Sequence, residues 1–204
     1  MGMGLSASAF FHCMCKDFNC LIFSMGIFTK RGDKGRTDLI GKKNVKKKSE
    51  IVAAIGIVDE LNCFVGWAGA ASGTNGSLSL DEDAKKMSDK LEVLKKIQQV
   101  LYKIGTELAG GEGVDLAIET EWAEWLIEKL CAGREFGGEE LKPANSNKFG
   151  FAVPGEKGEF SARLHLCRAA CRRAERAVCR IRRCEPILQF LNRLSDLFFA
   201  MAEC

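Results

Sequence analysis

The sequence predicts an all-α protein, a bundle of five helices that follows a basic, glycine-containing loop. Two observations carry this prediction: apolar residues recur at helical spacing in five segments, and almost no segment has the pattern of a strand. The chain has 204 residues, 47% of them hydrophobic and 28% charged, which is enough for one domain with a sizeable core. We therefore expect residues 25–204 to form a single helical domain.

The expected helices are separated by segments of loop composition. They cover residues 49–71, 81–110, 119–132, 161–183 and 185 onward. Ser49 is placed to cap the first helix, and Trp122 and Trp125 are expected to face inward from the third. Residues 72–80 and 133–150 are rich in glycine and polar residues, which is typical of loops.

Composition excludes several classes of protein. A net charge of +3, with no aromatic residues interleaved in the basic runs, argues against a nucleic-acid-binding protein. No stretch reaches the roughly 18 uncharged apolar residues that a membrane span needs. Most of the ten cysteines lie singly on apolar helical faces, which indicates a reducing compartment. Cys13 and Cys15 lack a second pair at useful spacing, so we expect no zinc site.

Residues 1–24 form an N-terminal extension of different character. They are apolar and rich in phenylalanine and cysteine, with one lysine, one aspartate and no arginine. A secretory signal needs a positive start and a mitochondrial transit peptide needs arginines, and this segment has neither pattern. We expect a cytoplasmic protein, with the mitochondrial matrix as the alternative if this extension is a targeting segment.

A basic stripe runs along the expected helix 161–183. Arg168, Arg172, Glu175 and Arg176 fall at i, i+4, i+7 and i+8, on one side of an α-helix. An apolar stripe that should face the core consists of Leu164, Cys167, Cys171, Ala174, Val178 and Ile181. Guanidinium groups bind phosphates and carboxylates well, but a solvated basic face has the same pattern. From this helix alone both interpretations stay open.

The loop at residues 27–38 combines glycines, hydroxyl groups and cations. Gly32 and Gly35 would let backbone N–H groups approach an anion closely, as in a phosphate cradle. The spacing that follows does not fit the G-x-x-x-x-G-K-[ST] pattern of a Walker A loop. The lysine-rich run 42–48 is either a solvated patch or a segment that closes over a bound polyphosphate.

The remaining polar residues do not form a covalent-catalysis site. Asp59 interrupts the apolar face of the first helix, where it would either pair with an arginine of another helix or face water. The two histidines, His12 and His165, are not placed for a Glu-x-x-His metal motif or for a Ser or Cys triad. We expect His165 to lie in the core or to support a neighbouring residue.

Several segments together resemble the PduO-type ATP:cob(I)alamin adenosyltransferases. They are TKRGDKG (29–35), VDELN (58–62), FAVPG (151–155), RAACRRAER (168–176) and LNRLSDL (191–197), with residues 95–105 also similar to the second helix of that family. The segments occur in the order of the family and span about residues 27–202. The resemblance implies a homotrimer of ferritin-like, up-down five-helix bundles with active sites between subunits.

The resemblance also implies roles for individual residues. The ATP-binding residues would be Thr29, Lys30, Arg31, Gly32, Asp33, Lys34, Gly35, Thr37, Asp38, Lys46, Arg172, Arg173, Glu175, Arg176 and Asn192. Glu175 would hold Mg²⁺, and Lys46 would close over the triphosphate. Asp59 would pair with Arg168 across the subunit boundary, with Arg172 and Phe151 completing the catalytic set. Phe151 would lie under the corrin ring, with a role as a capping core residue as the alternative.

The implied reaction suits the residues present. Cobalt(I) of cob(I)alamin attacks the 5′-carbon of ATP and the triphosphate leaves, so no side-chain nucleophile is needed. The protein then has to position the substrates and stabilise the charge of the departing triphosphate. Handover of adenosylcobalamin to a dependent mutase, and contact with a corrinoid reductase, are expected partnerships.

The chain departs from the family pattern beside Phe151. Glu156 and Lys157 stand before Gly158, where the family usually has a second glycine directly after Pro-Gly, so we expect a different turn beneath the corrin. Two other functions compete with the enzyme. One is a catalytically inactive carrier or regulator of the cofactor, and the other is a basic RNA-binding module, whose binding would weaken steeply with salt.

Overall fold

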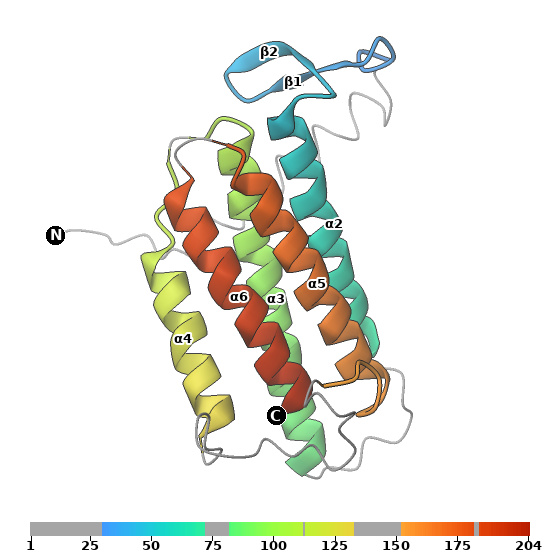
Figure 1. Ribbon diagram of the computed structural model, residues 1–204, viewed down its shortest axis with the longest axis vertical. Coiled ribbons are helices and arrows are strands. Elements are labelled where there is room, and N and C mark those ends of the chain that lie inside the picture. The colour runs from blue at the N-terminus through green and yellow to red at the C-terminus, as the bar shows by residue number, and fades with distance from the viewer. Residues whose placement is uncertain (1–29, 72–81, 112, 133–151, 182–183) are drawn as a thin grey trace, which may run out of the picture.

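The computed structural model describes residues 30–71, 82–111, 113–132, 152–181 and 184–204, and confirms the all-α prediction. Its helices are α2 (Glu50–Ala71), α3 (Glu82–Leu108), α4 (Ala117–Cys131), α5 (Glu159–Val178) and α6 (Glu185–Glu203). Successive helices run in alternate directions along the long axis of the molecule (Figure 1). In this up-down bundle, α5 packs against α2 and α6, while α3 packs against α2 and α4 against α6.

The basic loop region contains a small sheet, which the sequence did not lead us to expect. Strands β1 (Arg36–Leu39) and β2 (Lys42–Lys46) form an antiparallel hairpin with an irregularity between Thr37 and Leu39. At this bulge, Oδ1 of Asp38 accepts a hydrogen bond from the backbone N–H of Asn44 at 2.8 Å. The lysine-rich run is therefore largely a strand, which holds its side chains in a defined order.

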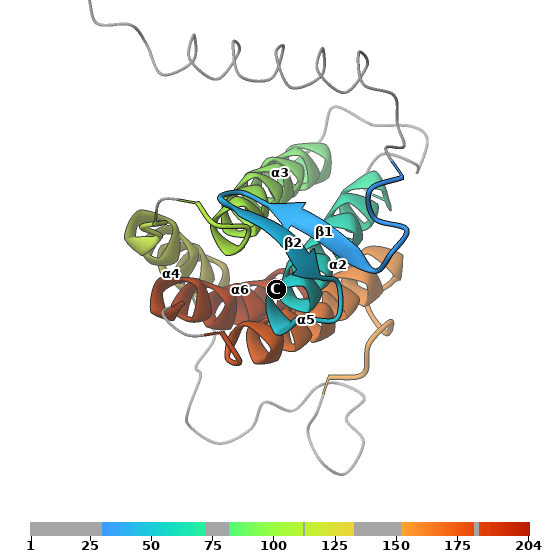
Figure 2. The same cartoon turned by 90° about the horizontal axis from the view of Figure 1, so that it is seen from above.

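The hairpin lies across the end of the bundle from which α2 starts (Figures 1 and 2). Its turn rests on the end of α3, where a Cβ atom at Gly110 would lie only 2.2 Å from the carbonyl oxygen of Ile40. Gly110 also has a φ of 110°, so glycine is required there for both space and backbone conformation. This contact fixes the hairpin, and the residues it carries, relative to the helices.

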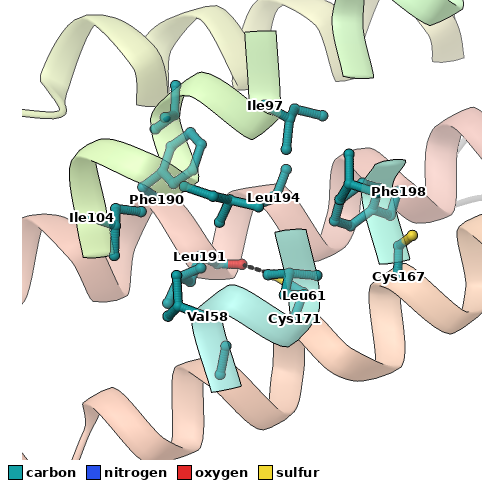
Figure 3. Packing of buried hydrophobic residues seen from close by; sticks show 14 of the residues in the cluster. Val58, Leu61, Ile97, Ile104, Cys167, Cys171, Phe190, Leu191, Leu194 and Phe198 are labelled. Carbon is teal, nitrogen blue, oxygen red and sulfur yellow. Dashed lines mark hydrogen bonds between the residues drawn. The ribbon is translucent and has the colours of Figure 1, made fainter. Parts of the chain in front are cut away.

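The core lies between all five described helices, as the helical spacing predicted. Figure 3 shows side chains from α2, α3, α5 and α6 meeting in it, among them Leu61, Ile97, Cys171 and Phe198, each with at most 1% of its surface exposed. The thiol of Cys171 donates a hydrogen bond to the carbonyl oxygen of Leu191 at 3.2 Å. Cys167 and Cys171 thus act as small core residues, as expected for single cysteines on apolar helical faces, but the same expectation is wrong for Cys63 and Cys179, which are exposed.

Three local predictions were wrong. The arginine helix ends at Val178, and residues 179–181 continue as a tighter turn in which Ile181 N–H bonds to the carbonyl of Val178 at 2.8 Å. Ser49 does occupy the position before α2, and its carbonyl accepts from Ala53, but its Oγ makes no hydrogen bond among the described residues. Trp125 is 54% exposed because α4 packs mainly on α6.

One described helix, α2, is long and apolar enough to cross a membrane by length and composition alone. The core helix of a bundle has the same composition. Five of its side chains, Ala54, Val58, Leu61, Val65 and Ala68, are buried in the core.

The buried thiols make a test of this packing. Burial raises the pKa of Cys167 to about 12 and raises that of Cys171 well above its ordinary value, so both stay protonated at about pH 8. We expect iodoacetamide to alkylate the exposed Cys63 and Cys179 of the native protein, and to reach Cys167 and Cys171 only after denaturation. Peptide mass spectrometry after timed labelling measures this; equal rates at all four positions would contradict the packing.

Candidate functional site

A basic pocket of about 390 Å³ lies on the hairpin, and it gathers much of the loop predicted to bind phosphate. Its lining residues are Arg31, Gly32, Arg36, Thr37, Asp38, Asn44 and Lys47. Nζ of Lys47 lies where a Cβ atom of Gly32 would come within 2.8 Å, so the glycine gives the ammonium group room against the loop backbone. Cations, a hydroxyl group and exposed backbone together suit an anionic ligand.

A second basic pocket, of about 410 Å³, shares Arg36 and Lys47 with the first. Its other lining residues are Lys34, Gly35, Lys46 and Lys48. The lysine expected to close over the triphosphate, Lys46, lines this second pocket, whereas Lys47 lines both. The sequence indicated the loop 27–38 and the run 42–48 but did not single out Arg36, Asn44 or Lys47, because their convergence depends on the pairing of β1 with β2.

Lys30 and Asp33 belong to the turn that leads into the hairpin. Lys30 has a φ of 58°, and its carbonyl oxygen accepts a hydrogen bond from Asp33 N–H at 3.4 Å. Both side chains are exposed. Thr29 and Phe151, two further predicted site residues, lie outside the described residues.

The arginine helix α5 presents its basic stripe at the surface, with Arg172, Arg173 and Arg176 exposed. Arg173 forms an ion pair with Glu60 of α2. The structure therefore gives Glu60 a partner within the chain. Arg172 makes no ion pair among the described residues, which leaves its guanidinium group free to meet a ligand.

A polar network connects α5, α6 and α4 behind this stripe. Nδ2 of Asn192 donates to Oε1 of Glu175 at 3.1 Å, and Arg193 donates to Oδ1 of Asn192 at 2.9 Å. Nε of Arg193 in turn donates to Glu124 of α4 at 2.6 Å. The predicted neighbours Glu175 and Asn192 do contact each other. Arg193, which is bonded to Glu124, fixes the amide of Asn192. The sequence did not indicate Glu124, which belongs to no recognised motif.

Glu175 suits a magnesium ion that arrives with ATP. Mg²⁺ usually takes one or two carboxylates together with phosphate oxygens and water. No group of three or more metal-ligating side chains occurs in the described part of the chain, so a site built only of protein ligands is not present there. One carboxylate, oriented by Asn192, matches the donor set of a nucleotide-borne ion.

Asp59 and Arg168 do not pair with each other within the chain. Asp59 is exposed and lines a groove of about 180 Å³ between α2 and α3, together with Tyr102. Arg168 is half-buried, and its Nε has no hydrogen-bond partner among the described residues. An unpaired buried N–H is costly, so a partner from outside the chain is expected for it.

The structure describes one basic surface on the hairpin and another on α5. Neither hairpin pocket is lined by a residue of α5. Each surface gathers cations that suit an anionic ligand. Fold and site together define an all-α bundle with two basic surfaces suited to an anionic ligand.

The chain is similar to known proteins over most of its length. A family model for cobalamin adenosyltransferase matches residues 27–204. The corrinoid adenosyltransferase of Bacillus subtilis (strain 168) is 35% identical over 184 residues, which cover 87% of this chain and 85% of that protein. The corrinoid adenosyltransferase MMAB of Homo sapiens is 31% identical over 191 residues, which cover 86% of this chain and 67% of that protein.

Solved structures agree. A phenylalanine-to-histidine variant of a PduO-type ATP:corrinoid adenosyltransferase from Lactobacillus reuteri, complexed with cobalamin and ATP, aligns with a TM-score of 0.67 at 31% identity. The alignment covers 87% of this chain and 89% of that chain. An arginine-to-lysine variant from the same organism, complexed with ATP, gives a TM-score of 0.66 at 32% identity, over 86% and 91% of the two chains. This chain belongs to the cobalamin adenosyltransferase family.

Proposed function

We propose that the protein transfers the 5′-deoxyadenosyl group of ATP to cob(I)alamin and so makes adenosylcobalamin. The electron pair of cobalt(I) forms the Co–C5′ bond, while the C5′–O bond breaks and its electron pair leaves with the triphosphate. The observation that carries this proposal is the hairpin pocket, where Arg31, Arg36 and Lys47 converge beside Gly32. Membership of the family supplies the identity of the two substrates.

The residues of this chain contribute positioning and charge. The hairpin cations would bind the triphosphate, and Arg172 and Arg176 would stabilise the charge that develops as it leaves. Glu175, oriented by Asn192, would hold the magnesium ion, which supplies further positive charge to the phosphates. Phe151 would lie under the corrin ring. Since none of these groups has to act as a nucleophile, this chemistry needs no histidine-based triad.

A second subunit would complete each site. No residue of α5 lines a hairpin pocket, and both Asp59 and Arg168 lack a partner among the described residues. A cyclic homotrimer, in which Asp59 of one subunit meets Arg168 of the next, would satisfy both and join the two basic surfaces. A cytoplasmic location, handover to a mutase and contact with a corrinoid reductase are further predictions from the sequence.

The reaction can be tested directly. Anaerobic incubation of the protein with chemically reduced cobalamin and MgATP should produce the spectrum of the Co–C bond and an equal amount of triphosphate. Omitting either ATP or the reductant should abolish both products. If folded protein binds ATP and cobalamin but yields neither product, the protein is a carrier, and the proposed activity is wrong.

A further inference from the structure

The end of the bundle opposite the hairpin contains a polar cluster that the proposed reaction does not use. Here α6 ends and α5 begins, and residues 152–158 form the turn that leads into α5 (Figure 1). Lys157 of this turn contacts the last residues of α6. Its Nζ donates to the backbone carbonyl oxygen of Glu203 and forms an ion pair with Oε2 of the same residue at 3.0 Å.

Glu203 is held from a second side by His165 of α5. Nε2 of His165 lies 2.9 Å from Oε1 of Glu203, and only 3% of the His165 side chain is exposed. The edge of the Phe199 ring packs at a steep angle to the imidazole, with ring centroids 6.1 Å apart. The two oxygens of one carboxylate thus bind two different groups, one on the turn and one inside α5. We call Lys157, Glu203 and His165 the C-terminal clamp.

The physical setting favours cations at this position. The last carbonyl groups of a helix have no partner within it and carry partial negative charge. Lys157 satisfies the carbonyl of Glu203, and Lys90 of α3 donates to that of Met201 at 3.4 Å. Burial alone raises the pKa of Glu203, but hydrogen bonds from Lys157 and His165 outweigh it and hold the pKa below its ordinary value of 4.5.

The lowered pKa of Glu203 determines the pH range in which its carboxylate stabilises the clamp. A carboxyl group with a lowered pKa stabilises the folded state above its ordinary pKa, and this contribution is lost as the pH falls through the lowered value. The carboxylate is therefore charged at neutral pH. Lys157 and His165 face it from the turn and from α5, and Lys90 of α3 lies near Lys157 and Cys204 at the same end of the bundle.

The turn itself has little internal support. Two backbone hydrogen bonds cross it, from Glu156 to Val153 at 3.3 Å and from Gly158 to Gly155 at 3.1 Å. Gly155 and Gly158 have φ values of 101° and 94°, which only glycine adopts readily. A turn with so few internal hydrogen bonds depends on contacts with the rest of the protein for its position. The contacts of Lys157 with Glu203 at the end of α6 are of this kind.

We propose that Lys157, Glu203 and His165 are positioning residues that fix the turn 152–158 and thereby the corrinoid side of the active site. This inference rests on the proposed function, because the turn begins at the residue after Phe151. It also gives a role to the Glu156-Lys157 departure, because Lys157 of this pair ties the turn to α6. The clamp acts through the turn and does not contact ATP.

The test compares Glu203→Gln and Lys157→Met with wild type, with Lys95→Met as control. Lys95 makes an exposed ion pair with Glu92 on α3, so the control removes a lysine of similar exposure elsewhere. Hydrogen–deuterium exchange at residues 152–158 should accelerate about tenfold in both clamp variants. The Kd and KM for cobalamin should rise about three- to tenfold, with KM for ATP unchanged, as expected for a partly exposed ion pair. Lys157→Arg keeps the positive charge, so its exchange rate and its cobalamin affinity should be close to those of wild type.

The outcomes separate this proposal from the proposed function. Unchanged exchange in both variants would overturn the clamp, and so would faster exchange with unaltered cobalamin binding. An equal rise in KM for ATP would show a general structural role and would overturn it as well. If wild-type protein forms no adenosylcobalamin, the proposed function fails, while exchange and cobalamin binding still decide whether the clamp positions the turn.

Discussion

Replacing Arg172 with alanine is expected to lower kcat by about 10²- to 10³-fold, the usual cost of removing one donor to transition-state charge. Arg172 is exposed on α5 and makes no ion pair among the described residues, so its removal disturbs no contact that holds the bundle. Its guanidinium group would act on the triphosphate as the C5′–O bond breaks. The far-ultraviolet circular dichroism and the thermal midpoint should stay close to those of wild type. Initial rates of Co–C bond formation measure the effect.

Arg180→Ala is the matched control for this prediction. Arg180 is an exposed arginine that follows the end of α5, and it belongs to neither half of the proposed site. It should retain near-normal turnover. Near-normal turnover in Arg172→Ala as well would mean that the basic stripe is a solvated face, the alternative that the sequence alone left open.

The second large effect is expected for Asp59→Asn, which should reduce turnover by about 10²-fold. Asp59 lines the groove between α2 and α3, and the asparagine keeps its size and can still donate or accept hydrogen bonds. The variant would lose only the negative charge that we propose to lie opposite Arg168 of the next subunit. Because Arg168 is half-buried with an unpartnered Nε, that loss leaves a cation without compensation at the boundary.

Glu121→Gln provides the comparison, since Glu121 is an exposed carboxylate on α4, away from the proposed boundary. It should leave the rate unaltered. If Asp59→Asn were as active as Glu121→Gln, Asp59 would be a solvated residue of α2 and the pairing with Arg168 would be wrong. Raising the salt concentration should not rescue the Asp59 variant, because salt screens a charge but does not replace a partner.

The sequence predicted the helices well because each helix buries an apolar stripe, and the apolar residues of such a stripe recur at helical spacing within the segment itself. The hairpin was missed for the opposite reason. Strand β2 exposes every side chain except that of Val45, and β1 buries none fully, so the lysine-rich run has no alternating pattern. The pairing depends instead on the turn at Gly41 and the contact at Gly110. Trp125 was expected to face inward but is exposed, because α4 packs mainly against α6, and the spacing of apolar residues does not show how many helices cover a given helix.

The site was predictable to the extent that its residues lie in recognisable segments. Glu175 and Asn192 are distant in sequence, and the structure brings them within 3.1 Å. Lys47 and Glu124 were not indicated, because one depends on strand register and the other supports Arg193 from a helix without a motif. Both positions depend on contacts between segments that are distant in the sequence, which the pattern within one segment does not show.

The central claim is that each active site is completed by a second subunit, and mixing two inactive variants tests it most directly. Asp59→Asn disables the surface that α2 provides, and Arg172→Ala disables the surface that α5 provides. In randomly mixed trimers about a quarter of the boundaries should combine two intact surfaces. Activity should therefore rise to about a quarter of wild type after the subunits are unfolded together and refolded. Activity no greater than the average of the two variants, with mixed trimers demonstrated by mass spectrometry, would contradict a shared site.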